Sequence, residues 1–148
     1  MTMRISARGE YAVKAVLDLA AHRNGRLVPI QEIAARQAIP QRYLEHVLLA
    51  LKRAGLLTSK RGSTGGYHLT RPPEEITVGA VLRAVEGTGA AFETLGRERQ
   101  VQAGDHDLAE LWGEISEAVC SVVDRFTFAE LAARAADRRG GARAMYHI

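Results

Sequence analysis

The sequence is almost free of cysteine: its 148 residues contain one, Cys120. A single cysteine excludes an intrachain disulfide, which is typical of a protein from a reducing compartment. Long apolar runs are also missing, because no stretch approaches the roughly 20 residues that span a bilayer. The first residues lack the uninterrupted apolar segment of a secretory signal. We therefore expect a cytoplasmic protein with one compact core.

Acidic residues are scarce in the first half of the chain. Residues 1–71 contain twelve Lys or Arg and four Asp or Glu, which gives this half a net charge of +8. Residues 72–148 carry a net charge of −5, and the whole chain carries +3. A basic half of this kind is typical of a protein that binds a polyanion such as DNA.

A catalytic pattern is also lacking. The glycine-rich stretch RGSTGGY at 61–67 has neither the lysine nor the spacing of a phosphate-binding P-loop. His106 stands among Asp105, Asp107 and Glu110, and this cluster is the basis for the hypothesis of a metal-dependent enzyme. Acidic residues at a helix start stabilise the helix dipole without any metal. We expect no enzyme, no metal site and no cofactor.

The strongest pattern in the sequence lies between residues 30 and 71. Apolar residues at helical spacing predict two short helices, which are separated at Ala38–Pro40 and end at Gly55. The buried faces are formed by Ile30, Ile33, Ala34 and Gln37 in the first helix and by Leu44, Val47, Leu48 and Leu51 in the second. Polar residues on the outer face of the second helix suit the major groove of DNA. Leu49 on that face suits a thymine methyl group or packing under the hairpin that follows.

Two short strand-like runs follow the second helix. Residues 56–61 and 67–69 flank the turn Gly62–Gly66, whose residues tolerate a positive φ. Lys60 and Arg61 lie beside this turn, where a phosphate or a minor groove would lie. The two helices and the hairpin together predict a winged helix-turn-helix, which is a mainly α fold with a small β-hairpin wing.

Capping signals and apolar periodicity predict four further helices. Their ranges are 7–22 after the cap Ser6, 78–86 after the cap Thr77, 105–125 from Asp105, and 128 to about 136 after the capping box Thr127–Glu130. Residues 138–141, with two glycines, are expected to be flexible. We predict a winged helix-turn-helix DNA-binding domain at 1–86, a flexible loop at 87–104, and a dimerisation helix, short helix and tail at 105–148.

The predicted helix at 105–125 has an apolar seam that is too long for a small winged domain to cover. Its members are Leu108, Leu111, Trp112, Ile115, Val119, Val122 and Phe126. Steps of three and four residues are typical of helix–helix pairing, so we expect two copies of the chain to pair here as a dimer. Packing of this helix onto its own domain is the alternative. Cys120 is expected to be a small buried hydrophobe beside the seam.

Four stretches of the sequence resemble the Rrf2 family of bacterial transcription regulators. They are MRISARGEYAVKAVLDLA, IAARQAIPQRYLEHVLLALKRAGLL, RGSTGGYHL and ITVGAVLRAVEG. The Tyr43–Glu45 triplet and the glycine-rich stretch Arg61–Tyr67 are the most specific parts. LWGEISEAVCSVVDRFTFAELA is similar to the dimerisation helix of the family and the helix after it. The resemblance implies a homodimeric regulator that binds palindromic operator DNA.

The resemblance also implies which residues contact DNA. It places Glu45 at base edges, where a carboxylate accepts from cytosine N4, and Arg61 in a narrow minor groove. The full predicted set is Arg8, Gln41, Arg42, Tyr43, Glu45, His46, Lys60, Arg61 and Gly62. Pro40 replaces the small polar cap that is common in relatives.

The chain departs from the family in the region that senses the signal. Iron–sulfur members carry three cysteines before the long helix, whereas residues 87–105 contain none. The chain is therefore most similar to the cluster-free, CymR-like branch, which works through a partner protein or an unknown signal. We expect a repressor without a cofactor, with cysteine or sulfur metabolism as a candidate target. A thiol-based redox sensor using Cys120 and an interaction module without DNA binding are the alternatives.

Overall fold

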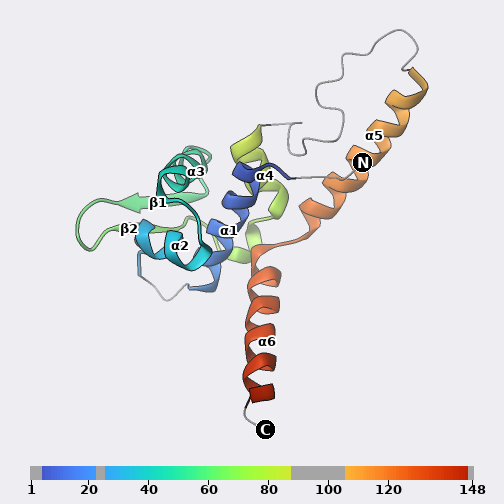
Figure 1. Cartoon of the computed structure of the whole chain (residues 1–148). Coiled ribbons are helices and arrows are strands. Elements are labelled where there is room, and N and C mark those ends of the chain that lie inside the picture. The colour runs from blue at the N-terminus through green and yellow to red at the C-terminus, as the bar shows by residue number, and fades with distance from the viewer. Residues whose placement is uncertain (1–4, 23–25, 88–105, 147–148) are drawn as a thin grey trace.

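The computed structural model describes residues 5–22, 26–87 and 106–146. Within these ranges the chain is mainly helical, with a two-stranded antiparallel sheet (Figure 1). The elements are α1 (Ala7–Ala21), α2 (Ile30–Gln37), α3 (Gln41–Arg53), β1 (Leu57–Lys60), β2 (Gly66–Leu69), the short 3-10 helix η1 (Pro73–Glu75), α4 (Val78–Glu86), α5 (His106–Arg125) and α6 (Phe128–Tyr146). The predicted fold class is confirmed. The predicted loop at 87–104 and the helix start at Asp105 lie almost entirely outside the described residues.

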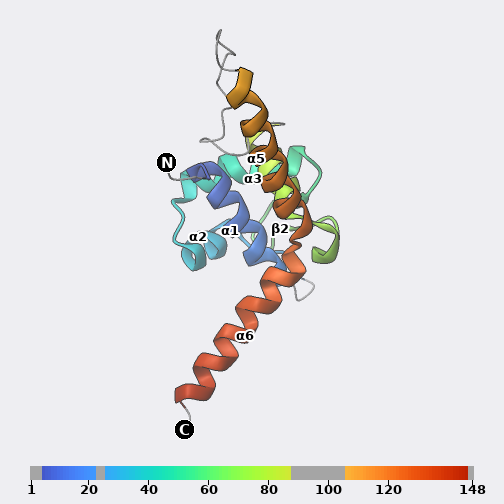
Figure 2. The same ribbon diagram turned by 90° about the vertical axis from the view of Figure 1, so that its right-hand side faces the viewer.

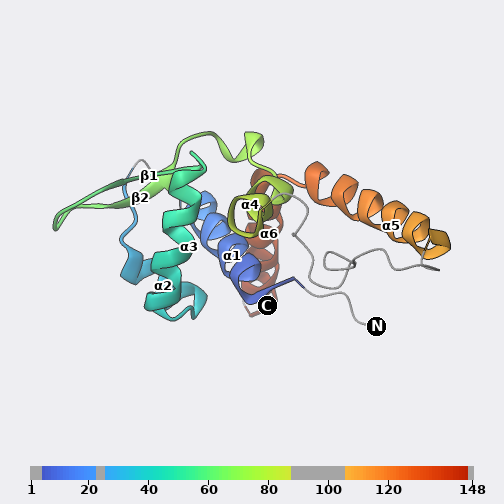
Figure 3. The same cartoon turned by 90° about the horizontal axis from the view of Figure 1, so that it is seen from above.

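Helices α1 to α4 and the hairpin form the body of the molecule, from which α5 and α6 extend. In Figure 1 the hairpin points to the left, α5 rises to the right and α6 descends. The view turned by 90° shows α5 and α6 passing the body from top to bottom (Figure 2). Seen from above, the hairpin and α5 lie at opposite ends of the molecule (Figure 3). The wing and the long helix are thus free to contact different partners.

Side-chain caps fix the starts of α1 and α4, as the sequence predicts. The Ser6 hydroxyl accepts a hydrogen bond from the backbone N–H of Gly9 at 3.0 Å. The same hydroxyl donates to the carboxylate of Glu86, which ties the start of α1 to the end of α4. The Thr77 hydroxyl accepts from the N–H of Ala80 at 3.1 Å. Both caps satisfy helix N–H groups that have no partner within the helix.

The turn between α2 and α3 depends on one residue in the left-handed region. Ala38 has φ 54° and ψ 45°, a conformation that residues with a Cβ rarely adopt. Its N–H donates to Ala34 and closes the end of α2. Pro40 then precedes α3 without a side-chain cap. The predicted break at 38–40 is confirmed.

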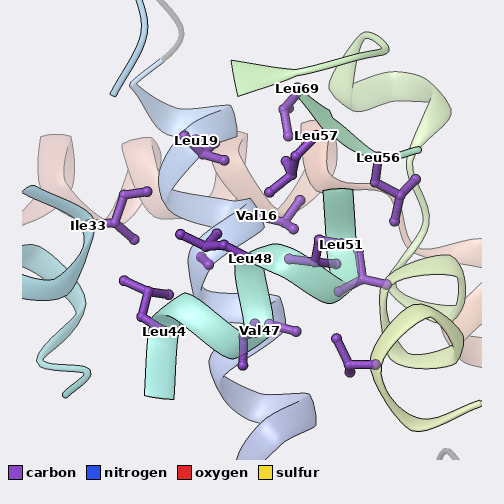
Figure 4. Packing of buried hydrophobic residues seen from close by; sticks show 14 of the residues in the cluster. Val16, Leu19, Ile33, Leu44, Val47, Leu48, Leu51, Leu56, Leu57 and Leu69 are labelled. Carbon is purple, nitrogen blue, oxygen red and sulfur yellow. The ribbon is translucent and has the colours of Figure 1, made fainter. Parts of the chain in front are cut away.

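The hydrophobic core lies where α1 crosses α3 beneath the hairpin. Figure 4 shows Leu48 and Leu51 of α3 next to Val16 of α1, and Leu44 on the side of Ile33 of α2. Leu57 and Leu69, which pair across the sheet, close the core from the wing side. The predicted inner face of α3 is buried in full, at Leu44, Val47, Leu48 and Leu51. Burial of this face leaves the opposite face of α3 exposed.

The wing is a four-residue ladder that is anchored to the chain before α2. Strand β1 pairs with β2 from Leu57↔Leu69 to Lys60↔Gly66. Val28 then pairs with Tyr67 through two backbone hydrogen bonds of 2.9 Å. Gly66 has φ 153°, and a Cβ there would lie 2.5 Å from the Val28 carbonyl oxygen. This glycine therefore permits the close approach that anchors the wing.

The final helix α6 is longer than the sequence predicts. It begins after the Thr127 cap, whose hydroxyl accepts from the N–H of Glu130 at 3.3 Å. It continues to Tyr146, so the predicted end near Ala136 and the predicted flexibility of 138–141 are wrong. A glycine inside a helix costs only about 1 kcal/mol relative to alanine. The alanine- and arginine-rich sequence around the two glycines therefore carries the helix through them.

Candidate nucleic-acid interface

The outer face of α3 presents polar side chains to solvent. Gln41, Arg42, Tyr43, Glu45 and His46 are all exposed. They occupy the first two turns of the helix, which is the part of a recognition helix that contacts base edges. The predicted α3 contact residues therefore share one accessible surface.

A groove runs between α3 and the wing, and we call it the α3–wing groove. It has a volume of about 550 Å³ and is lined from α3 by Glu45, Leu49 and Lys52. The wing contributes Lys60 and Arg61 from the opposite side. Three cations and one carboxylate thus face the same space, which favours an anionic ligand such as a phosphate backbone.

The structure brings together some of the predicted DNA-binding residues and not others. Glu45, Lys60, Arg61 and Gly62 all line the α3–wing groove. Gln41, Arg42, Tyr43 and His46 lie on the exposed surface of α3 outside the groove lining. Arg8 is exposed one turn before Tyr11, whose ring centroid is 6.4 Å from that of Tyr43. Arg8 is therefore near the start of α3 rather than in the groove.

Lys52 is a groove residue that the sequence reasoning missed. Its ammonium donates to the Ser59 hydroxyl at 2.7 Å, so it joins the end of α3 to the wing. Glu45, Leu49 and Lys52 follow the spacing i, i+4, i+7, which places them on one helical face. This spacing was the signal available in the sequence. Leu49 is 44% exposed, as its position on the outer face predicts.

A buried ion pair holds α2 against α1 and so supports the helix-turn-helix. The Asp18 side chain is fully buried. Arg36 donates to both of its carboxylate oxygens at 2.9 Å, and Gln37 donates to Oδ1 at 3.0 Å. The hydrogen bond from Asp18 raises the pKa of Arg36 above its usual range. A bidentate pair of this kind fixes orientation as well as distance.

Helix α5 leaves its apolar seam exposed or half-buried. Leu108, Leu111 and Val122 are 42–46% exposed, although they are large apolar side chains. The other predicted seam residues are half-buried: Trp112, Ile115, Val119 and Phe126. From Leu108 to Arg125 the helix has no buried residue. Exposed apolar side chains that lie along one helix are typical of an interaction site.

A salt bridge and a short backbone pairing join α5 to the body. Arg83 of α4 donates to both carboxylate oxygens of Asp124, at 2.6 and 2.7 Å. This contact lowers the pKa of Asp124 and raises that of Arg83. The N–H of Val78 donates to the Phe126 carbonyl at 3.0 Å. The direction in which α5 leaves the body is thus fixed at its C-terminal end.

Two features are absent from the described residues. Among them, no group of three or more His, Cys, Asp or Glu side chains gathers in a way that would hold a metal ion. Asp105 lies outside the described residues, and so do the side chains of His106 and Asp107. No helix of the described part of the chain is long and apolar enough to cross a membrane.

Comparison with known proteins gives consistent results for sequence and structure. A family model described as "Rrf2: Iron-dependent Transcriptional regulator" matches residues 5–134. The HTH-type transcriptional regulator IscR of Serratia proteamaculans is 41% identical over 130 residues, which cover 87% of this chain and 79% of the relative.

Solved structures match over similar lengths. The structure of CymR from B. subtilis, which is described as the global cysteine regulator, is 30% identical with a TM-score of 0.76. The match covers 90% of this chain and 98% of that one. T. potens IscR is 32% identical with a TM-score of 0.73, over 89% of this chain and 88% of that one.

Proposed function

Because the chain belongs to the Rrf2 family of transcriptional regulators, we propose that it is a sequence-specific DNA-binding repressor. The family consists of regulators and not of enzymes, so the function resides in binding. In this proposal the N-terminal part of α3 enters the major groove of operator DNA. The wing reaches the neighbouring minor groove.

The observation that supports this proposal best is the α3–wing groove. Glu45 and Arg61 line it from opposite sides, one on the helix and one on the wing. Glu45 accepts a hydrogen bond from cytosine N4, while Arg61 enters the negative potential of a narrow minor groove. Lys52 and Lys60 pair with phosphates. These contacts fix the position of the protein on the duplex, so that Glu45 and Arg61 each reach their groove.

The functional unit in this proposal is a homodimer joined along α5. The exposed apolar side chains of α5 are buried against the same side chains of a second copy, which removes them from water. A two-fold dimer presents two copies of α3, so its operator is palindromic. The centres of the two half-sites are then about 34–36 Å apart, or a multiple of this spacing.

The residues of this chain do not fit an iron–sulfur cluster. Such clusters are held chiefly by several cysteine thiolates. The chain has a single cysteine, Cys120, which is half-buried in the middle of α5. Cys120 lies beside Arg83 of α4, and we assign it to packing between α5 and α4. The signal is then a partner protein or an effector molecule rather than a cluster bound by this chain.

Overall sequence identity does not decide whether this chain works as the IscR relatives do or as CymR does. Identity is 41% to the IscR of Serratia proteamaculans and 30% to the CymR of B. subtilis. The missing cysteines are therefore what support a cluster-free, CymR-like regulator. The description of B. subtilis CymR as a cysteine regulator makes cysteine or sulfur metabolism the first target to test.

DNA binding is tested with operator duplex, obtained by sequencing the genomic fragments that the purified protein retains. Fluorescence anisotropy then measures affinity as a function of salt concentration. Wild type is expected to bind with a steep salt dependence, and Arg61→Ala to lose affinity and about one unit of the salt slope. Glu45→Ala should relax discrimination at one base pair by about 1–3 kcal/mol.

The matched control is Arg138→Ala, which removes the same charge from the exposed surface of α6. Its DNA affinity is expected to equal that of wild type, apart from a small decrease caused by the lower net charge. Failure of the wild-type protein to bind any duplex at low salt would refute the proposal. Equal losses for Arg61→Ala and Arg138→Ala would show that charge alone, and not the groove, determines binding.

A further inference from the structure

A second cavity lies on the other face of the wing, between the hairpin and the end of α1. We call it the α1–wing cavity. Its volume is about 470 Å³, within the range of about 300–1,000 Å³ that is typical of sites for small molecules. Its walls come from three separate segments: the end of α1, residues 26–28, and the two strands. Of the proposed DNA contacts, Lys60 alone also lines this space.

The floor of the α1–wing cavity is apolar. Leu19, Val28 and Leu69 line it and are at most 9% exposed, so they lie at its base. Leu27 adds a half-buried aliphatic side chain. A floor of this kind favours the hydrocarbon part of an organic molecule over a bare phosphate or a water-filled space.

The rim of the cavity is cationic. Arg26, Lys60 and His68 are exposed at its edge, and His22 contributes a second imidazole. No aspartate or glutamate lines the cavity. Glu32 pairs with Arg26 at 3.0 Å from outside the lining, but it also accepts from Arg36 at 3.1 Å. Arg36 is also paired with Asp18, so two carboxylates balance the two guanidinium groups, and the excess positive charge at the rim is that of Lys60.

The α1–wing cavity and the α3–wing groove share part of their walls. Ser59, Lys60 and Tyr67 line both spaces. The strand that carries Tyr67 is anchored to Val28, which forms part of the cavity floor. A molecule in the cavity therefore touches the residues that position the wing, and it competes for the ammonium group of Lys60.

We propose that the α1–wing cavity binds a small organic anion, a carboxylate with an apolar body, and that this ligand weakens operator binding by drawing Lys60 away from DNA. The apolar body rests on Leu19 and Val28, and the carboxylate pairs with Arg26 and Lys60 at the rim. The proposal that a ligand binds here depends on the cavity alone. The regulatory part rests on the proposed DNA-binding function.

Binding is tested on the DNA-free, ¹⁵N-labelled protein by NMR titration. The probes are 3-phenylpropionate, its neutral isostere 3-phenylpropanamide, and inorganic phosphate. The propionate is expected to shift the amide signals of residues 27–28, 58 and 68–69, and to bind more tightly than the other two. Shifts confined to α5, or equal affinity for the neutral amide, would overturn the proposal.

Two variants locate the anion. Arg26→Gln should weaken the propionate about tenfold, the loss expected for one charge-assisted hydrogen bond. Thr58→Glu places a carboxylate on an exposed wall of the cavity and should abolish binding. Arg138→Gln is the matched control, because it removes one exposed cation far from the cavity. Unchanged affinity in Arg26→Gln and Thr58→Glu would refute the assigned site.

Regulation is tested by adding the propionate to the operator titration. Wild type should lose DNA affinity as the cavity fills, and Thr58→Glu should not respond. Unchanged DNA affinity at a saturating probe concentration would refute the regulatory part. If DNA shifts the cavity amides while the propionate does not, the cavity is a contact for flanking phosphates and the proposal is wrong. Absence of DNA binding by wild type would refute the proposed function. The NMR titration would still show whether the cavity binds the propionate.

Discussion

The replacement Asp18→Asn tests whether the buried ion pair sets the packing of the helix-turn-helix. Asn keeps the size of the side chain but removes its charge. In the native protein both carboxylate oxygens accept from Arg36, and Oδ1 also accepts from Gln37. The side-chain amide nitrogen of Asn is a hydrogen-bond donor, and it would face an Arg36 nitrogen that is also a donor. The variant therefore loses at least one hydrogen bond and the whole charge–charge attraction.

The size of the effect follows from the burial of the two partners. Removing one partner of a fully buried ion pair costs about 3–5 kcal/mol. Here the Asp18 side chain is fully buried, but that of Arg36 is 30% exposed and regains some hydration. We therefore expect a loss of about 2–3 kcal/mol in the free energy of unfolding. For a chain of this length that corresponds to a fall in Tm of roughly 5–10 °C.

The assay is thermal and urea unfolding at fixed protein concentration, because the proposed dimerisation would make the Tm concentration-dependent. A double-mutant cycle with Arg36→Gln separates the pair from the two single losses, and a coupling of about 1–3 kcal/mol is expected. Glu10→Gln is the control. Glu10 forms an exposed i,i+4 pair with Lys14 on the same helix, and such pairs contribute little.

Two results would refute this reasoning. If Asp18→Asn were as stable as Glu10→Gln, burial of the carboxylate would not matter. If the double variant lost the sum of the two single losses, Asp18 and Arg36 would not act as a pair. In either case the orientation of α2 would have to depend on apolar packing alone.

Three further predictions concern α5 and the wing. Leu111→Lys should convert the proposed dimer to a monomer in analytical ultracentrifugation, because it places a charge in the apolar seam; an unchanged mass would contradict the proposed interface. Gly66→Ala should lower the free energy of unfolding by about 1–3 kcal/mol, because its Cβ would clash with the Val28 carbonyl. A Tm equal to that of wild type would show that the backbone around Val28 moves to accept the Cβ without a loss of stability. Arg83 lowers the pKa of Asp124 below its ordinary value of 3.8, so the pair contributes stability above that pH and loses it as the pH falls through the lower, folded-state pKa. The stability that wild type gains over Asp124→Asn should therefore shrink as the pH falls below 3.8, and a difference that does not change with pH would contradict this assignment.

Most of the fold was predictable because its signals are local. Ser6 and Thr77 cap the helices that follow them through contacts three residues away. The inner face of α3, formed by Leu44, Val47, Leu48 and Leu51, follows from helical spacing alone. The end of α6 was mispredicted by the same local reasoning, because a pair of glycines weakens a helix without ending it.

The candidate site was only partly predictable. Spacing and family resemblance identified Glu45 and Arg61, and both line the groove. Lys52 was missed because its hydrogen bond to Ser59 joins residues of two different elements. The α1–wing cavity was not predicted at all, since its walls come from segments that lie far apart in the sequence.

The sequence by itself determined where the helices begin, which faces they bury, and that a basic winged helix-turn-helix lies in the first half of the chain. Those features depend on hydrogen bonds and side-chain spacing within a few residues. Only the tertiary structure decided that Asp18 meets Arg36, that Val28 anchors the wing, and that both faces of the hairpin bear a cavity. These contacts arise when distant segments share one core, and no periodicity along the chain encodes the distance between two segments that pack together.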